Sequence, residues 1–201
     1  MILLLLIVSG VSTGPSLRPT HINHPPLWVF GYGSLMWNPG FAHTDRALAT
    51  LDGYHRSFCM RSVHHRGRPE KPGLVLALDP APGAACHGLA FAVAPENRAR
   101  TLAYLRDREL VSSAYLERVL PVRLFDGREV EAVTYVVDTG HVQYCGGLPL
   151  EEQARITVAA VGGRGPNTEY LYNTALHLAE LDIEDAELAW LADRVRALEE
   201  A

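Results

Sequence analysis

The sequence predicts an α+β fold in which one mostly antiparallel sheet or barrel comes first along the chain and helices come last. Short apolar runs rich in β-branched and aromatic residues, separated by glycine and proline turns, occupy the earlier part of the chain. Helical periodicity dominates roughly the last fifty residues. The chain of 201 residues, 48% hydrophobic and 20% charged, suits one domain with a sizeable core.

The strands are predicted from their apolar content and from the turn residues that bound them. They cover, in order, residues 27–32, 55–63, 74–78, 88–93, 119–125 and 131–137. The last two flank Asp126-Gly127, a strong turn signal, and therefore predict a hairpin. Helices are predicted over residues 96–110, 150–161 and about 184–199, and another is expected to start at Asn167 as its N-cap.

The first 26 residues carry a separate expectation. Residues 1–8 form an unbroken apolar run that is too short to span a bilayer. The first arginine is Arg18, so the basic segment that precedes a secretory signal is missing. We expect residues 1–26 to be a disordered leader or the product of a start codon set too far upstream, with a signal peptide as the alternative. The ordered domain is expected over residues 27–201.

Charge and cysteine usage narrow the function classes. The formal net charge of −5 argues against a general nucleic-acid binder, which is normally basic. The three cysteines, Cys59, Cys86 and Cys145, are odd in number and widely spaced, so neither a disulfide framework nor a zinc site is indicated. They predict structural thiols in a reducing cytoplasm. The histidines His64-His65, His21 and His24 lack the i, i+4 spacing of a helical zinc site, so no metal is expected.

A glycine loop, Gly31 to Leu35 (GYGSL), directly follows the first predicted strand. Successive N–H groups in such a turn can form a concave anion site, although a plain turn at the end of a strand explains the pattern equally well. Met36 stands where a dinucleotide-binding fingerprint needs its third glycine. Ser34 does not lie in the Gly-x-Ser-x-Gly arrangement of a hydrolase nucleophile.

The predicted helix over residues 96–110 places a carboxylate on its apolar side. Leu102 and Leu105 define the buried stripe, and Glu109 returns to that stripe after nearly two turns, whereas Asp107 points away from it. A charged carboxylate that faces the core without a partner costs several kcal/mol. Glu109 therefore needs a partner or a function.

The helical spacing leaves two interpretations of Glu109 open. One is a structural ion pair with an arginine such as Arg61 or Arg123. The other is a carboxylate in a pocket, whose pKa is raised by desolvation so that it can exchange protons.

Several motifs occur in a fixed order along residues 27–198. They are Trp28 to Pro39, Gly53 to Arg56, Arg61-Ser62, His65 to Gly67, Lys71 to Gly73, Tyr104-Leu105 with Arg108-Glu109, and Gly165 to Leu171. Taken together they resemble the ChaC family of glutathione-specific γ-glutamylcyclotransferases. The resemblance implies a small mixed β-barrel with flanking helices, no cofactor, and cleavage of glutathione into 5-oxoproline and Cys-Gly.

The resemblance also implies site residues. Glu109 matches the family's proton acceptor, and Tyr144 matches a tyrosine that lines the site. The loop that holds the γ-glutamyl group corresponds to Phe30, Gly31, Tyr32, Gly33, Ser34 and Leu35. Other γ-glutamyl peptides or amines as substrates, and a non-enzymatic regulator of cation transport, are the alternatives. The sequence does not predict an oligomeric state.

One segment departs from the pattern of the family. Animal members have Gly-Gly-Tyr after the glutamate, whereas this chain has Ser112-Ser113-Ala114-Tyr115. The tyrosine is kept and the glycines are not, which leaves the shape of this loop and the breadth of substrates open.

Overall fold

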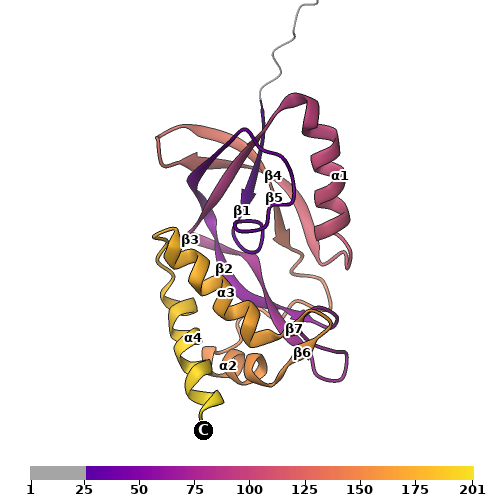
Figure 1. Ribbon diagram of the computed structural model, residues 1–201, viewed down its shortest axis with the longest axis vertical. Helices are drawn as coiled ribbons and strands as arrows, with labels where there is room; N and C mark the ends of the chain where they lie inside the picture. Colours follow the sequence, from indigo (N-terminus) through magenta and orange to yellow (C-terminus); the bar gives the residue numbers. More distant parts are fainter. Residues whose placement is uncertain (1–25) are drawn as a thin grey trace, which may run out of the picture.

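The structure is a computed structural model that describes residues 26–201 (Figure 1), so the predictions for the leader lie outside it except at residue 26. Strands close a barrel in the order β1-β3-β2-β4-β5. They are β1 (Leu27–Gly31), β2 (Asp45–Ser62), β3 (Gly73–Val93), β4 (Tyr115–Leu124) and β5 (Glu129–Val137). Neighbours pair antiparallel, except that β5 pairs parallel with β1 and, at one position, with β3. The predicted α+β fold with a mixed barrel is confirmed.

Strand β1 is buried along its whole length because it has a core on each face. Trp28 and Phe30 point into the barrel interior, while the alternate residues Leu27 and Val29 face a second apolar cluster that includes Leu105 of helix α1 (Arg98–Glu109). A short 3₁₀ turn, η1 (Pro95–Asn97), leads into this helix. The double burial explains why the strand is an apolar run without polar alternation.

Strands β2 and β3 continue beyond the barrel and carry the remaining helices (Figure 1). Those helices are α2 (Leu150–Ala159), α3 (Asn167–Glu180) and α4 (Ala186–Glu199), with a small hairpin of β6 (Val161–Gly162) and β7 (Gly165–Pro166) before α3. Phe58, Leu74 and Leu76 of the two strands pack against the apolar faces of these helices. No helix in residues 26–201 has the length and apolar character needed to cross a bilayer.

Strands β2 and β3 are much longer than the sequence pattern predicts, whereas β4 and β5 differ from it by a few residues at their ends. The runs expected at residues 74–78 and 88–93 belong to the single strand β3, although Pro80 and Pro82 lie between them. Over residues 80–87 only β2 pairs with β3, and the register shifts there by several residues, so a missing proline N–H breaks no central ladder. Strand β2 likewise begins at Asp45 rather than at residue 55.

Asn167 has a different role from the predicted N-cap. It is the first residue of α3, it is fully buried, and its side chain binds the backbone of β3 instead of its own helix. Its Oδ1 accepts the N–H of Leu74 at 2.6 Å and its Nδ2 donates to the Leu74 carbonyl at 2.8 Å. This pair of bonds fixes the start of α3 against the sheet.

Candidate active site

A cleft of about 720 Å³ opens where the loop after β1, the last turn of α1, the end of β2 and the first turns of α3 meet. Its lining contains Glu109 together with four consecutive residues of the glycine loop, Tyr32 to Leu35. Residues far apart in the sequence, and singled out for separate reasons, therefore share one cavity. Its volume suits a small-molecule ligand.

Three residues of the predicted site lie outside the lining of this cleft. Phe30 is fully buried inside the barrel, and Gly31 ends the buried strand that precedes the loop. Tyr144 differs most from expectation, because its hydroxyl donates to Asp79 at 3.0 Å and its ring packs against another apolar cluster. Backbone roles for Phe30 and Gly31 stay predictions.

The glycine loop folds into a tight turn that leaves amide groups open. The N–H of Met36 donates to the carbonyl of Gly33 at 2.8 Å, and the N–H of Asn38 donates to that of Ser34 at 2.9 Å. The preceding amides of Gly33, Ser34 and Leu35 donate to no acceptor within residues 26–201. Consecutive unpaired N–H groups in a turn provide an anion-binding nest.

Glu109 ends α1 and is half-buried, with 20% of its side chain exposed. Its Oε1 lies 3.1 Å from Nε of Arg108, so the ion pair forms with neither Arg61 nor Arg123. Burial raises the pKa of this carboxyl, and the opposing charges of Arg108 and Arg164 reduce that rise without cancelling it. A carboxyl whose pKa is raised binds its proton more tightly than an exposed glutamate, which suits a group that takes up and then releases a proton.

Arg108 joins Glu109 to the glycine loop. Besides the contact with Glu109, its Nη1 donates to the carbonyl of Asn38 at 2.7 Å and to the hydroxyl of Tyr104 at 3.0 Å. Its Nη2 donates to Oγ of Ser34 at 2.9 Å. These contacts of Arg108 are not predictable from the sequence, because adjacent residues in a helix interior normally diverge.

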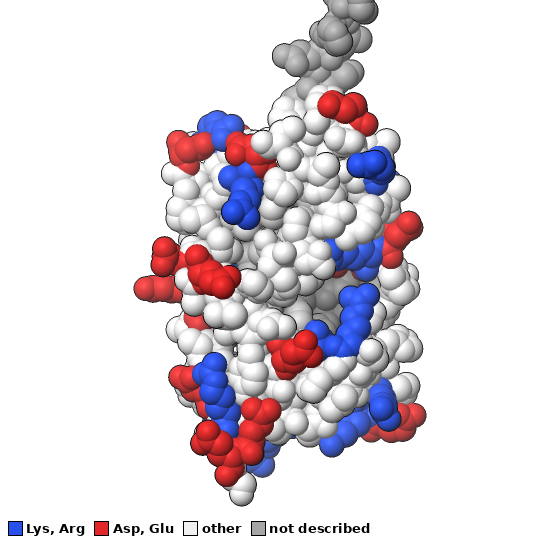
Figure 2. All heavy atoms as spheres, viewed as in Figure 1, with Lys and Arg blue, Asp and Glu red and all other residues white. Residues whose placement is uncertain are grey.

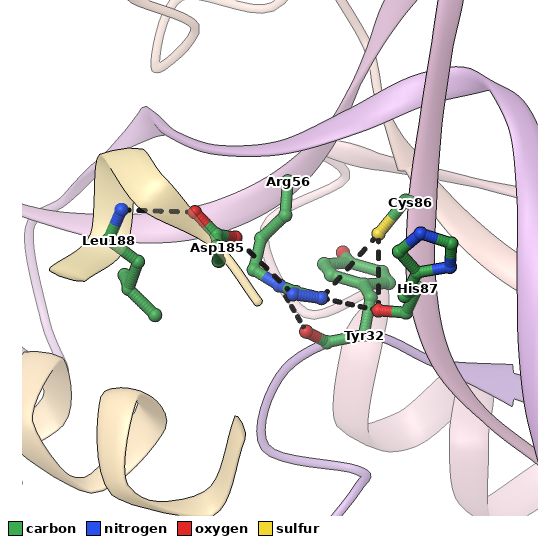
Figure 3. A network of polar contacts seen from close by, with 6 residues as sticks. All are labelled: Tyr32, Arg56, Cys86, His87, Asp185 and Leu188. Carbon is green, nitrogen blue, oxygen red and sulfur yellow. Dashed lines mark hydrogen bonds and ion pairs between the residues drawn. The ribbon is translucent and has the colours of Figure 1, made fainter. Parts of the chain in front are cut away.

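Arg56 of β2 holds the same loop from behind (Figure 3). Its side chain is buried, its Nε donates to the carbonyl of Tyr32 at 2.8 Å, and its Nη2 donates to the carbonyl of His87. Its Nη1 lies 3.4 Å from Asp185, whose other oxygen caps α4 by accepting the N–H of Leu188 at 3.0 Å. Arg56 lies in the strand predicted over residues 55–63, but its contacts with the glycine loop join distant parts of the chain and were not predicted.

Tyrosines complete the wall around Glu109. Tyr32, Tyr115, Tyr135 and Tyr170 all line the cleft. Burial raises the pKa of Tyr32 and Tyr115 well above the usual value, and that of Tyr170 to about 12. At neutral pH these phenols are uncharged hydrogen-bonding groups, so among these residues Glu109 is the side chain with the chemistry to accept a proton.

Histidines are the commonest side-chain ligands for metal ions in proteins. His64 and His65 line the cleft, whereas His21 and His24 lie outside the described residues. In the part of the chain that the structure describes, no three histidine, cysteine or acidic side chains gather closely enough to hold a metal ion.

A closed mixed barrel with a glycine loop and a half-buried carboxylate in one cleft belongs to the γ-glutamylcyclotransferase-like folds. A crystal structure of a γ-glutamylcyclotransferase specific to glutathione from yeast superposes with a TM-score of 0.78 at 24% identity, covering 87% of this chain and 97% of that one. YkqA from Bacillus subtilis superposes with a TM-score of 0.54 at 20% identity, over 85% of this chain and 54% of that one.

Sequence comparison identifies the family. The family model described as ChaC-like protein matches residues 27–198, and this chain belongs to that family. The glutathione-specific γ-glutamylcyclotransferase of Escherichia coli K12 is 36% identical over 196 residues, which cover 96% of this chain and 84% of the relative. The γ-glutamylcyclotransferase 2-1 of Arabidopsis thaliana is 35% identical, over 85% of this chain and 82% of the relative.

Proposed function

We propose that this protein opens glutathione by internal cyclisation, releasing 5-oxoproline and Cys-Gly. The observation that carries the proposal is the shared cleft, in which the raised-pKa carboxyl of Glu109 and the open amides of the glycine loop line one cavity. Relatives named glutathione-specific γ-glutamylcyclotransferase, at 36% identity in Escherichia coli and 34% in human, support the choice of substrate.

In the proposed reaction the α-nitrogen of the γ-glutamyl group attacks its own γ-carbonyl carbon. The new C–N bond closes the five-membered lactam, and the C–N bond to cysteine breaks. The α-nitrogen starts as an ammonium and ends as a lactam N–H, so it must lose the protons that the departing amine gains. Glu109 can carry them, because one carboxylate can act as base and then as acid; such catalysis supplies about 10²–10⁴-fold in rate.

The loop amides and the walls of the cleft supply the rest of the rate enhancement. The N–H groups of Gly33, Ser34 and Leu35 can hold either the substrate carboxylate or the oxyanion that develops on the γ-carbonyl. An attack within one molecule also requires a folded substrate, and a cavity that holds the γ-glutamyl chain in that shape lowers the barrier further.

We also propose the setting in which the enzyme acts. Residues 27–201 form one functional domain, its partner is a small molecule rather than a nucleic acid or a membrane, and it works in the cytoplasm. The net charge of −5 and the free thiols, of which Cys59 and Cys86 are buried, support this assignment.

The test is release of 5-oxoproline from millimolar glutathione by the purified protein. We expect Glu109→Gln to lower kcat by about 10²-fold or more, whereas the exposed Glu96→Gln should retain wild-type rates. γ-Glutamyl-alanine, assayed in parallel, distinguishes a broader cyclotransferase from a glutathione-specific one. Binding of glutathione without turnover, unaffected by Glu109→Gln, would instead establish a ligand-binding regulator.

Thermal unfolding of the same variant separates lost chemistry from lost folding. Because burial raises the pKa of Glu109 in the folded state, its protonated form favours folding below the ordinary glutamate pKa. That contribution is lost as pH rises through the raised pKa, and above it the buried ionised carboxylate costs stability. Glu109→Gln should therefore have a Tm at pH 7.5 no lower than wild type, and a large fall in Tm would assign the lost activity to misfolding.

A further inference from the structure

The lining of the cleft is rich in arginine although the protein as a whole is acidic. The chain has 18 lysines and arginines against 23 acidic residues. Among the residues that line the cleft, the charged side chains other than histidine are Arg61, Arg66, Arg108, Arg164, Asp107 and Glu109. Figure 2 shows lysine or arginine atoms on both sides of a hollow in the face it displays. Positive charge is therefore concentrated where a ligand would enter.

Two of these arginines have no partner for their guanidinium groups among the residues that the structure describes. Arg108 is bound to the glycine loop and Glu109, and Arg66 pairs with Glu169 at 3.1 Å. Within residues 26–201, the guanidinium groups of Arg61 and Arg164 form no ion pair and no hydrogen bond. Their donors are available to a ligand.

The backbone fixes Arg164 beside the end of β2. The N–H of Gly163 donates to the carbonyl of His64 at 2.7 Å, and the N–H of Arg164 donates to that of His65 at 2.8 Å. A Cβ on Gly162 would clash with the backbone amide of Gly67, so the β6–β7 hairpin and the β2–β3 loop touch backbone to backbone. Arg164 is also close enough to Glu109 to lower the pKa of that carboxyl.

We infer that Arg61 and Arg164 form a subsite for the C-terminal carboxylate of the leaving dipeptide. This inference rests on the proposed function. Once the γ-glutamyl amine reaches Glu109, the other end of the substrate lies two residues away, which is about 7 Å at 3.3–3.6 Å per extended residue. A carboxylate is the group that unpaired guanidinium donors bind best, often in a bidentate pair. The subsite selects γ-glutamyl peptides with a free C-terminus over γ-glutamyl amines.

The experiment compares glutathione with its C-terminal amide, which loses only the charge of the glycine carboxylate. Wild-type protein should have a kcat/KM about 10- to 100-fold higher for the acid, the range of a charge-assisted hydrogen bond. In the double variant Arg61→Gln/Arg164→Gln, the acid-to-amide ratio of kcat/KM should fall to about 1, because loss of the Arg164 charge near Glu109 affects both substrates alike, whereas loss of the subsite affects only the acid. Arg68→Gln, in the β2–β3 loop and outside the lining of the cleft, should keep the wild-type ratio.

The outcomes separate this inference from the function on which it rests. A wild-type enzyme that releases 5-oxoproline from glutathione, with an acid-to-amide ratio that the double variant preserves, overturns the subsite alone. Equal losses for both substrates would place the arginines on the α-carboxylate of the γ-glutamyl group and also overturn it. A wild-type protein inactive on both substrates would remove the proposed function, and the subsite with it.

Discussion

The arginines of the cleft region fall into two groups that differ in what holds their guanidinium groups. Arg56 and Arg108 lie along the glycine loop, and their donors are used by loop carbonyls, a serine hydroxyl and carboxylates. Arg61 and Arg164 lie at the end of β2 and in the β6–β7 turn, with no such partner inside residues 26–201. Arginines with their donors occupied shape a site, whereas those with open donors can bind what enters it.

The largest difference between the two groups should appear when one arginine of each group, both on β2, is replaced by methionine. Arg56→Met removes a buried guanidinium and leaves Asp185 and two carbonyls without their donor, so we expect unfolding free energy to fall by about 3–5 kcal/mol. Arg61→Met, five residues further along β2, breaks no ion pair and should change it by less than about 0.5 kcal/mol. Urea unfolding of both variants measures the difference, and equal effects would contradict the division.

A smaller effect is expected from Arg108, and it should appear in the pH profile. Arg108 lowers the pKa of Glu109 against the rise caused by burial. Arg108→Met should therefore move the acidic limb of kcat/KM to higher pH, because the carboxylate then holds its proton more tightly. It should also reduce kcat by about 10- to 100-fold, on the scale of a lost charged hydrogen bond.

Arg108→Lys serves as the matched control. Lysine keeps the positive charge and loses the planar set of donors that reaches Ser34 and Asn38. The acidic limb should stay nearer the wild-type position while kcat remains reduced. A purely structural Arg108 would lower activity in both variants with no shift in the limb.

The smallest effect should come from salt. Raising ionic strength from about 0.1 M to 1 M shortens the Debye length from about 10 Å to 3 Å, which weakens attraction between exposed charges. KM for glutathione should rise about two- to threefold in the wild type, since an exposed pair is worth only about 1 kcal/mol in water. The Arg61→Gln/Arg164→Gln variant should show little of this rise in KM. An identical rise in the variant would contradict a role of Arg61 and Arg164 in attracting glutathione.

The parts of the molecule that depend on local pattern were predicted well from the sequence. The spacing of apolar residues along α1 predicts that Glu109 faces inward, and its side chain is half-buried in the structure. The hairpin across Asp126-Gly127 also forms as expected, with Gly127 at a positive φ of 91°. Partners of Glu109 were not predictable by the same means. Arg108 reaches it because position 109 ends the helix, while Arg123 pairs with Asp52 on the far part of β2.

Loop shape was equally hard to predict from residue types. The backbone shape of the segment after α1 could not be predicted, because the chain lacks the Gly-Gly pattern that the sequence analysis gave for animal members. In the structure, Ser113 adopts the left-handed conformation with a φ of 55°. A glycine would adopt this conformation at less cost. Tyr115 still follows in the wall of the cleft, so the backbone path does not depend on the missing glycines.

The contact between Arg56 and Asp185 has a consequence for how the protein matures during synthesis. Asp185 caps α4, which follows all the barrel strands in the chain, and it pairs with the arginine that fixes the carbonyl of Tyr32. No residue of α4 lines the cleft. A growing chain whose barrel residues have all left the ribosome therefore still lacks the acidic partner of Arg56, and we expect full activity to appear only after α4 has emerged.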